Sequence, residues 1–218
     1  MVYRACIFDL DGTLVHTTPE YRYDIVGRIL KNLGVSCASQ EMIDAVWFRS
    51  NRNGTIERGF GVSPVEFWEV FREYDTSESR KKSIQAYDDV IMLKELKGRG
   101  VSIGVVTGAP RRIAHLELEL VERVLGANYI DYLVLARRDS GIEPKPHPHG
   151  LHVCMGLLGI EPNHTPYVGN GDEDAIAARA AGALDVIIDR GEHAFDHPQP
   201  PSRVIRSLYE LREIVLDL

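Results

Sequence analysis

Residues 3–14 read YRACIFDLDGTL, and this stretch decides the fold. Its first part, from Tyr3 to Leu10, is a short apolar run that is rich in β-forming residues and carries an acidic residue, Asp9, near its end. Asp9 and Asp11 lie two residues apart at the end of that run, and Gly12 lets the chain turn sharply after them. The pattern predicts a buried strand that delivers two carboxylates to one edge of a sheet.

Comparable apolar runs recur later in the chain and alternate with helical patterns. The runs lie at residues 101–107, 132–136, 166–169 and 184–189, and the helical patterns at 88–99, 110–125, 148–158 and 173–181. Runs without strict polar alternation are typical of strands buried on both sides. Strands that alternate with helices favour a parallel sheet covered by helices on both faces. We therefore predict an α/β fold with a Rossmann-like core.

The interval from about residue 16 to residue 85 breaks this rhythm. It carries amphipathic helical patterns near residues 19–33, 40–48 and 63–74, and no convincing strand. The Gly- and Asn-rich segment 49–61 is predicted to be a loop, and a final helix is predicted near residues 204–215. The patterns predict a core of residues 1–15 and 86–218, interrupted by a helical insert of residues 16–85.

The composition disfavours several classes of protein. The 218 residues carry a formal net charge of −7 and are 44% hydrophobic, which is typical of a folded globular chain. The negative charge disfavours binding to nucleic acids and anionic membranes, which reward dense Lys and Arg. No apolar stretch is long enough to span a bilayer, and the N-terminus lacks the architecture of a signal peptide. We expect a cytoplasmic protein, either monomeric or homodimeric.

Four polar clusters follow apolar runs, at the sheet edge where ligands of open α/β sheets bind. They lie at residues 8–14, 105–108, 143–146 and 168–174. Each cluster alone is a weak signal, because Asp-Gly turns and lysines in proline-rich loops are common. Their shared position after apolar runs is the specific observation, and it predicts one composite site.

The residue types in these clusters suit phosphoryl transfer. Asp9 could attack phosphorus as a carboxylate nucleophile, and Asp11 could protonate the leaving alcohol and later deprotonate the attacking water. The Thr107 hydroxyl, the Gly108 amide and the Lys145 ammonium could surround the charged phosphoryl oxygens. A small phosphate ester is therefore the expected partner.

The same edge offers ligands for magnesium, which prefers oxygen and takes one or two carboxylates plus phosphate oxygens. Asp9, the backbone carbonyl of Asp11 and the loop from Asn170 to Asp174 could supply them. The acidic residues of that loop also have a simpler explanation, since negative charge favours the N-terminus of a following helix.

With these residues in view, the chain resembles the haloacid dehalogenase-like superfamily, most of whose members are phosphatases. The family's Asp-x-Asp-x-Thr motif matches residues 9–13, its Ser or Thr matches Thr107, its Lys matches Lys145, and its acidic motif aligns with Asn170 and Asp174. The Lys-Pro-His-Pro segment at residues 145–148 is similar to the phosphoglycolate-phosphatase-like branch. The resemblance covers nearly the whole chain, with the helical insert in the position of that branch's cap domain.

The resemblance implies a Mg²⁺-dependent phosphomonoester hydrolase with Asp9 as nucleophile and Asp11 as general acid and base. Thr107 and Lys145 would hold the phosphoryl group, Thr13 and Gly108 would contribute to substrate binding, and phosphoglycolate is a candidate substrate. A phosphomutase of the same superfamily and a non-catalytic phosphate-binding module remain alternatives.

One position departs from the family pattern. Asn170 stands where this branch usually has a magnesium-binding Asp, and a neutral amide oxygen should hold the cation less tightly than a carboxylate. We therefore predict weaker magnesium affinity, with Asp174 compensating in part.

Two further groups of residues are weighed against simpler explanations. Arg49, Arg52 and Arg58 lie in the helical insert and could pair with a substrate carboxylate, although solvated surface arginines are as common. The histidines at positions 147, 149 and 152 have no partners spaced to complete a zinc site, so a structural explanation is favoured.

Overall fold

The computed structural model describes residues 3–49, 51–193 and 199–216. The chain divides into two compact units. The first contains the chain up to His16 and from Gln85 onward, and the second is Thr17–Ile84.

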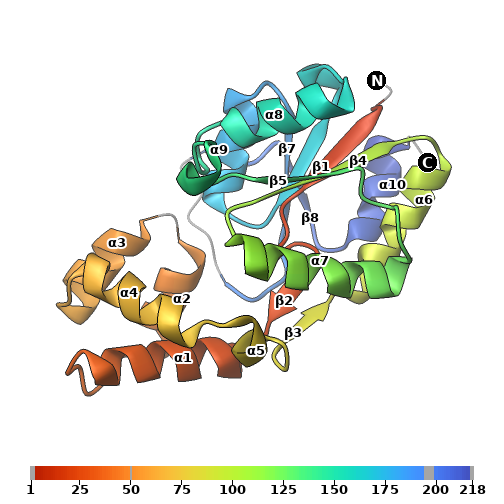
Figure 1. Cartoon of the computed structure of the whole chain (residues 1–218). Helices are drawn as coiled ribbons and strands as arrows, with labels where there is room; N and C mark the ends of the chain where they lie inside the picture. Colours follow the sequence, from red (N-terminus) through yellow and green to blue (C-terminus); the bar gives the residue numbers. More distant parts are fainter. Residues whose placement is uncertain (1–2, 50, 194–198, 217–218) are drawn as a thin grey trace. The chain divides into compact units, whose positions relative to one another are not determined.

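A single parallel sheet organises the first unit (Figure 1). Among the described residues it has six strands in the order β5-β4-β1-β6-β7-β8, and every neighbouring pair is parallel. The strands are β1 (Ala5–Phe8), β4 (Ser102–Thr107), β5 (Tyr132–Leu135), β6 (Pro166–Gly169), β7 (Leu184–Ile188) and β8 (Arg203–Ile205). The predicted parallel α/β fold is confirmed.

Helices cover both faces of this sheet, as Figure 1 shows. On one face lie α6 (Met92–Gly98), α7 (Arg111–Leu125) and α10 (Leu211–Val215). On the other lie α8 (His149–Leu158) and α9 (Asp172–Ala180). Short 3-10 turns occur at Asp88–Ile91, Arg138–Ser140, Pro162–His164 and Leu208–Glu210.

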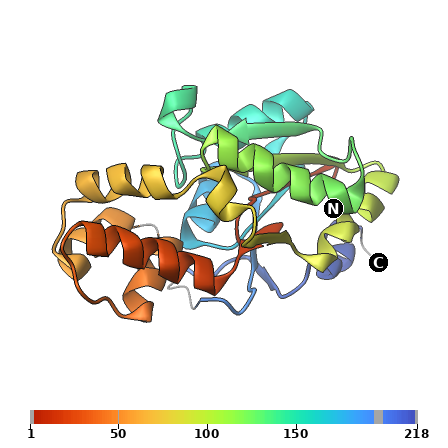
Figure 2. The ribbon, with the colours of Figure 1, turned by 60° about the horizontal axis from the view of Figure 1, so that its bottom comes forward.

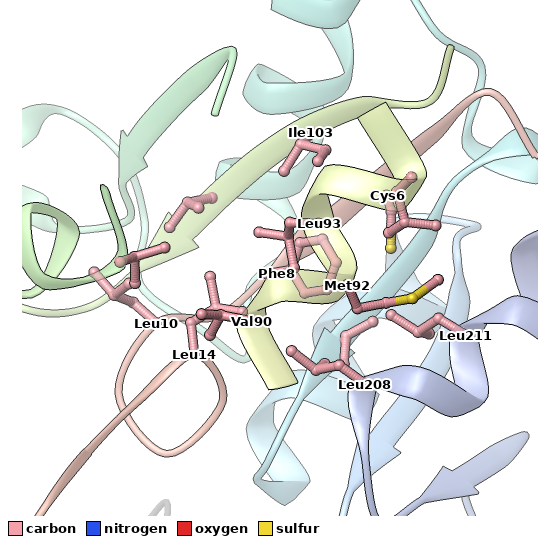
Figure 3. Packing of buried hydrophobic residues seen from close by; sticks show 14 of the residues in the cluster. Cys6, Phe8, Leu10, Leu14, Val90, Met92, Leu93, Ile103, Leu208 and Leu211 are labelled. Carbon is pink, nitrogen blue, oxygen red and sulfur yellow. The ribbon is translucent and has the colours of Figure 1, made fainter. Parts of the chain in front are cut away.

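The alternation of side chains along β1 divides the core into two clusters. Cys6 and Phe8 belong to the cluster under α6, α7 and α10, whereas Ile7 packs on the α8 and α9 side. Figure 3 shows Phe8 beside Met92 and Leu93 of α6. Each such buried side chain contributes about 1.5–3 kcal/mol relative to an exposed one. The same alternation directs Asp9, the residue after β1, toward the α8 and α9 side.

The second unit is helical and has its own apolar core. Its helices are α1 (Pro19–Asn32), α2 (Gln40–Phe48), α3 (Arg52–Thr55), α4 (Pro64–Tyr74) and α5 (Ser77–Arg80). Helices α1 and α4 lie side by side (Figure 2). Phe67 of α4 is fully buried, and its ring stacks on that of Phe60 with centroids 6.2 Å apart. A proline opens each of these two helices, where its missing N–H costs nothing.

The segment predicted to be a loop, residues 49–61, is largely helical where it is described. Helix α3 runs directly into a π-helical turn at Ile56–Phe60. The Asn51 side chain accepts a hydrogen bond from the Gly54 amide at 3.2 Å and so caps α3. The loop prediction was wrong because Asn and Gly were interpreted as chain breakers, whereas Asn51 acts as a helix cap.

Two other predictions of secondary structure were wrong at the ends of the predicted segments. Strands β2 (Val15–Thr17) and β3 (Ile84–Ala86) form a separate two-stranded sheet at the ends of the interval that was predicted to lack strands. The predicted final helix begins later, because Arg203–Ile205 pairs with β7 as an edge strand. Three-residue strands are held by backbone pairing and leave too short a pattern to detect. No described helix is both long and apolar enough to cross a bilayer.

Candidate active site

The predicted site residues of the first unit gather at the carboxyl edge of the sheet. Asp9 directly follows β1, Thr107 is the last residue of β4, and Asn170 directly follows β6. Because β1 lies between β4 and β6 and all three are parallel, their ends are neighbours. The Asp9 amide continues this pairing by donating to the Val168 carbonyl at 2.8 Å.

Lys145 connects two carboxylates at this edge. Its ammonium donates to Asp9 Oδ1 at 2.7 Å and to Asp174 Oδ1 at 2.6 Å. The Tyr167 hydroxyl also donates to Asp174 Oδ1, at 2.9 Å, and lies 3.3 Å from the Lys145 nitrogen. The Lys145 side chain is only 7% exposed. The Lys145 ammonium thus joins the segment before α8 to the start of α9 and the end of β1.

The charges in this cluster do not cancel. Asp9 and Asp174 share the single ammonium of Lys145, so one negative charge is in excess at a buried position when both carboxylates are ionised. Burial raises the pKa of Asp9 to about 7, and the Lys145 charge only partly opposes this. Burial alone would lower the pKa of Lys145, but the two carboxylates outweigh it and raise that pKa well above its usual value. Lys145 therefore stays charged, and the cluster favours an additional cation.

Asp174 is held from both sides at the start of α9. Besides Lys145 and Tyr167 at Oδ1, its Oδ2 accepts the backbone amides of Asn170 at 3.1 Å and Gly171 at 3.0 Å. Four donors therefore orient a carboxylate that is 2% exposed. The arrangement lets Asp174 aim Lys145 and shape the loop at the end of β6.

A tight turn after Asp9 brings the next motif residues close to Asn170. The Leu10 carbonyl accepts the amides of Leu14 at 2.9 Å and Val15 at 3.0 Å, and Gly12 adopts a φ of +79°. A Cβ at Gly12 would lie 2.0 Å from the Asn170 side-chain nitrogen. Only glycine fits there, both for its conformation and for the close approach of the Asn170 amide.

The remaining phosphate-binding candidates differ in exposure. Thr107 is 2% exposed, and its hydroxyl accepts the Ala109 amide at 3.1 Å. Gly108 is exposed, and its carbonyl accepts a hydrogen bond from Arg137 at 2.9 Å. Thr13 is fully buried, and its hydroxyl has no hydrogen-bond partner within the described residues. The Thr107–Gly108 turn thus reaches the surface of the edge, while Thr13 lies beneath it.

The donor set suits a hard divalent cation. Asp9 offers a carboxylate, Asp11 a backbone carbonyl and Asn170 a carboxamide, all of them oxygen donors. The excess negative charge beside Lys145 adds attraction for such an ion. In the part of the chain that the structure describes, no group of three or more His, Cys, Asp or Glu side chains is placed to hold a metal. A metal ion bound at this edge would therefore need neutral donors as well as Asp9.

The other predicted residues lie elsewhere. Arg49 is exposed and Arg52 half-buried, and both belong to the second unit, so their contact with substrate stays a prediction. His147 Nδ1 accepts the His149 amide at 3.1 Å, and His149 Nδ1 accepts the Glu143 amide at 3.2 Å. These backbone contacts support the structural explanation for His147 and His149.

Sequence reasoning missed Tyr167 and Arg190. Tyr167 lies inside a strand, where an aromatic residue reads as core, and only the fold brings its hydroxyl to Asp174. Arg190 lies just after the apolar run 184–189, at the same sheet edge as the other motifs. Its position directly after an apolar run could have identified it, but polar residues after the run 184–189 were not considered.

The chain is similar to known proteins over most of its length. The model of the family described as "Haloacid dehalogenase-like hydrolase" matches residues 6–188. The chain is 30% identical over 194 residues to a phosphoglycolate phosphatase of Xanthomonas campestris, covering 84% of this chain and 81% of the relative. It is 28% identical over 224 residues to phosphoglycolate phosphatase 1 of Pseudomonas aeruginosa, covering 95% and 78%.

Solved structures show the same fold. A hydrolase from Pseudomonas syringae aligns with a TM-score of 0.76 at 19% identity, over 99% of both chains. A HAD phosphatase from Thermococcus onnurineus aligns with a TM-score of 0.64 at 24% identity, over 97% of both chains. Because the family model spans most of the chain and the fold agrees, this protein belongs to the haloacid dehalogenase-like hydrolases.

Proposed function

We propose that the protein is a magnesium-dependent phosphatase that acts on a small phosphate ester through an aspartyl-phosphate intermediate. The observation that carries the proposal is the buried Lys145 ammonium held between Asp9 and Asp174 at the carboxyl edge of the sheet. A lysine in that place can bind a phosphoryl oxygen beside the attacking carboxylate. The phosphatase names of the curated relatives support the same reaction.

In the proposed reaction, a carboxylate oxygen of Asp9 forms a bond to phosphorus while the bond to the ester oxygen breaks. Asp11 gives its proton to the departing alcohol, which leaves neutral. Water then attacks the aspartyl-phosphate, Asp11 takes a proton from that water, and inorganic phosphate and Asp9 are released. The Lys145 ammonium, the Thr107 hydroxyl and the Gly108 amide would hold the phosphoryl oxygens throughout.

Magnesium would be held by Asp9, the Asp11 backbone carbonyl and the Asn170 carboxamide. When bound, the ion neutralises charge on the phosphoryl oxygens and orients the ester. Asp174 was also predicted to be a ligand, but its oxygens already accept four hydrogen bonds. The proposal therefore assigns Asp174 to the orientation of Lys145 and of the loop at Asn170.

We further propose that the helical second unit acts as a cap that recognises the part of the substrate beyond the phosphate. Arg49 and Arg52 are its candidate contacts, since a guanidinium pairs well with a carboxylate. Phosphoglycolate is then a natural candidate, in line with the relatives. Another relative is named "Pyrophosphatase PpaX", so pyrophosphate belongs among the compounds to be tested.

The test is phosphate release from a panel of small phosphate esters and pyrophosphate, with and without Mg²⁺. The control is Asp9→Asn, which keeps the shape of the side chain and removes the nucleophile. Turnover that requires Mg²⁺ and disappears in Asp9→Asn supports the proposal. Phosphate transfer between positions of a substrate, without release, would instead indicate a phosphomutase. Absence of any turnover by folded protein would favour a phosphate-binding module.

A further inference from the structure

Arg190 forms a second buried ion pair at the same edge of the sheet, two residues after β7. Its guanidinium donates to Asp89 Oδ2 at 2.7 Å and to Asp89 Oδ1 at 3.0 Å, which is a bidentate geometry. It also donates to the backbone carbonyl of Thr13 at 2.6 Å. The Arg190 side chain is only 9% exposed. One arginine thus ties the end of β7 to the turn that carries the Asp9 and Asp11 motif.

Asp89 extends these contacts to the C-terminal part of the first unit. It accepts the Ser207 hydroxyl at 3.0 Å and the Leu208 amide at 2.9 Å. Burial alone would raise the pKa of Asp89, but the hydrogen bonds from Arg190, Leu208 and Ser207 lower it. The Arg190 guanidinium also covers the Tyr87 ring, 3.8 Å from its centroid. The position of the guanidinium is therefore set from three sides.

The contact at Thr13 bears on Asp11. Thr13 follows Asp11 by two residues, and Gly12 between them has the conformational freedom of a residue without a Cβ. Backbone hydrogen bonds within the turn, from the Gly12 amide to the Val15 carbonyl at 2.7 Å and from the Leu14 amide to the Leu10 carbonyl at 2.9 Å, hold its shape from inside. The hydrogen bond from Arg190 to the Thr13 carbonyl adds a restraint from outside the turn, at the peptide that joins Thr13 to Leu14.

The charge of Asp11 also reaches this cluster. Burial raises the pKa of Tyr87, its hydrogen bond to Glu192 raises it further, and the negative charge of Asp11 adds to the effect. The Tyr87 hydroxyl donates to Glu192 Oε1 at 2.6 Å. Tyr87 therefore contacts Arg190 and lies within electrostatic reach of Asp11.

We propose that Arg190, held by Asp89, is a positioning residue that directs Asp11 toward the leaving-group oxygen. The inference rests on the proposed function, since it assigns a cause to the aim of the proposed general acid. Lysine could keep the charge of Arg190 but has no planar fork to bond Asp89 and the Thr13 carbonyl together. A loss of this geometry should weaken proton donation to the leaving group and leave phosphoryl binding intact.

The test compares two esters that differ in their need for a proton. An alkyl phosphate requires protonation of its alcohol, whereas p-nitrophenyl phosphate releases a stabilised anion without it. In Arg190→Lys, kcat for the best alkyl ester of the panel should fall about 100-fold, with a fall of less than about tenfold for p-nitrophenyl phosphate and little change in either KM. Asp89→Asn should show the same selective loss, and it carries the test if Arg190→Lys does not fold.

Arg212→Lys is the matched control, because Arg212 makes an exposed bidentate pair with Glu95 in the same unit. Its ratio of the two kcat values should equal that of the wild type. Equal losses on both esters in folded Arg190→Lys, or a rise in KM alone, would overturn the inference while the proposed function stands. A wild type that releases phosphate from no ester would overturn the proposed function and this inference with it.

Discussion

Two buried ion clusters lie at the same edge of one sheet, and they are built differently. In the first, the Lys145 ammonium is shared by Asp9 and Asp174, so one negative charge is in excess when both carboxylates are ionised. In the second, the Arg190 guanidinium meets the single carboxylate of Asp89 in a bidentate pair. The first cluster is open to a further cation and the second is balanced.

The two cations suit these different tasks. A lysine ammonium is a compact charge on a flexible stem and can exchange one oxygen partner for another, as binding of a phosphoryl group requires. An arginine guanidinium is planar and makes two parallel hydrogen bonds to a carboxylate, so it resists such an exchange of partners. Buried ion pairs of either kind add little net stability compared with an apolar core, although breaking one is costly. Their value here lies in placing the residues around Asp9 and Asp11.

Removal of the shared cation should have the largest effect. Lys145→Met leaves Asp9 and Asp174 buried together without a counter-charge. We expect kcat/KM to fall about 1000-fold. The free energy of unfolding should fall by about 3–5 kcal/mol at most, because one of the two carboxylates can take up a proton. Steady-state kinetics and denaturant unfolding measure both.

Lys97→Met is the control for this comparison. Lys97 pairs with Asp131 in the same unit, but about a third of each side chain is exposed. Its loss should leave kcat/KM unchanged and alter stability by less than about 1 kcal/mol. If Lys145→Met kept near wild-type activity, the first cluster would not be the phosphoryl site.

Gly12 lies between the two clusters, next to Asn170 on one side and Thr13 on the other. Gly12→Ala combines a strained φ of +79° with a Cβ 2.0 Å from the Asn170 side chain. Gly100→Ala is matched in backbone, with φ of +82°, but has nothing within 4 Å of the new Cβ. We expect about 1–3 kcal/mol of destabilisation from strain in both, and about a 100-fold loss of kcat/KM in Gly12→Ala alone.

Thermal unfolding and kinetics of the two glycine variants separate strain from contact. Equal activity in Gly12→Ala and Gly100→Ala would show that the approach of Asn170 to Gly12 is unimportant for the reaction. A larger destabilisation of Gly100→Ala than of Gly12→Ala would contradict the geometry of the turn.

The first cluster was predictable from sequence to a degree that the second was not. Asp9 and Asn170 each follow a strand and Thr107 ends one, and the parallel sheet brings the ends of such strands together. Lys145 was predicted as part of the polar cluster at residues 143–146, although it lies in an irregular segment before α8 and not directly after a strand. The α/β core followed from the same alternation of runs and helices.

The second cluster joins residues that no local pattern relates. Asp89 and Arg190 are 101 positions apart, and Ser207 lies still further along the chain. Which charged residue pairs with which depends on packing that hydrophobic periodicity does not encode. The short strand at Arg203–Ile205 was missed for the same reason, since its backbone partner is in β7. Polar residues beyond a strand end are the part that a closer sequence reading could have included.

The second cluster, the pair of Arg190 and Asp89, should make the stability of the protein depend on pH. The pKa of Asp89 is lowered below its ordinary value of 3.8, so its ionised form stabilises the folded protein above that pH. Asp89→Asn should lower the free energy of unfolding at neutral pH by about 2 kcal/mol, since it removes charge from hydrogen bonds of a buried pair. The difference from the wild type should shrink as the pH falls from 3.8, where Asp89 of the unfolded chain takes up a proton, through the lower pKa of Asp89 in the folded protein.

Thermal unfolding as a function of pH measures this difference. A gap between wild type and Asp89→Asn that persisted unchanged at acid pH would mean that Asp89 contributes by shape and not by charge. A gap that widened at acid pH would require a folded-state pKa above the ordinary value, contrary to the hydrogen bonds that Asp89 accepts.

Adding a negative charge to the first cluster tests its affinity for a cation. Asn170→Asp places a carboxylate beside Gly12, where the cluster already has one negative charge in excess. Mg²⁺ should then bind about tenfold more tightly, because each added carboxylate strengthens the attraction for a divalent cation. Without metal the same variant should be less stable than the wild type, because the new charge is repelled by its neighbours.

Calorimetric titration with Mg²⁺ measures the affinity without relying on turnover. Asn163→Asp is the matched control, since Asn163 is exposed and lies before β6, whereas Asn170 follows it. The control adds the same formal charge at the opposite end of one strand and should leave the affinity unchanged. If Asn170→Asp bound Mg²⁺ no more tightly than the wild type, Asn170 would not be a ligand.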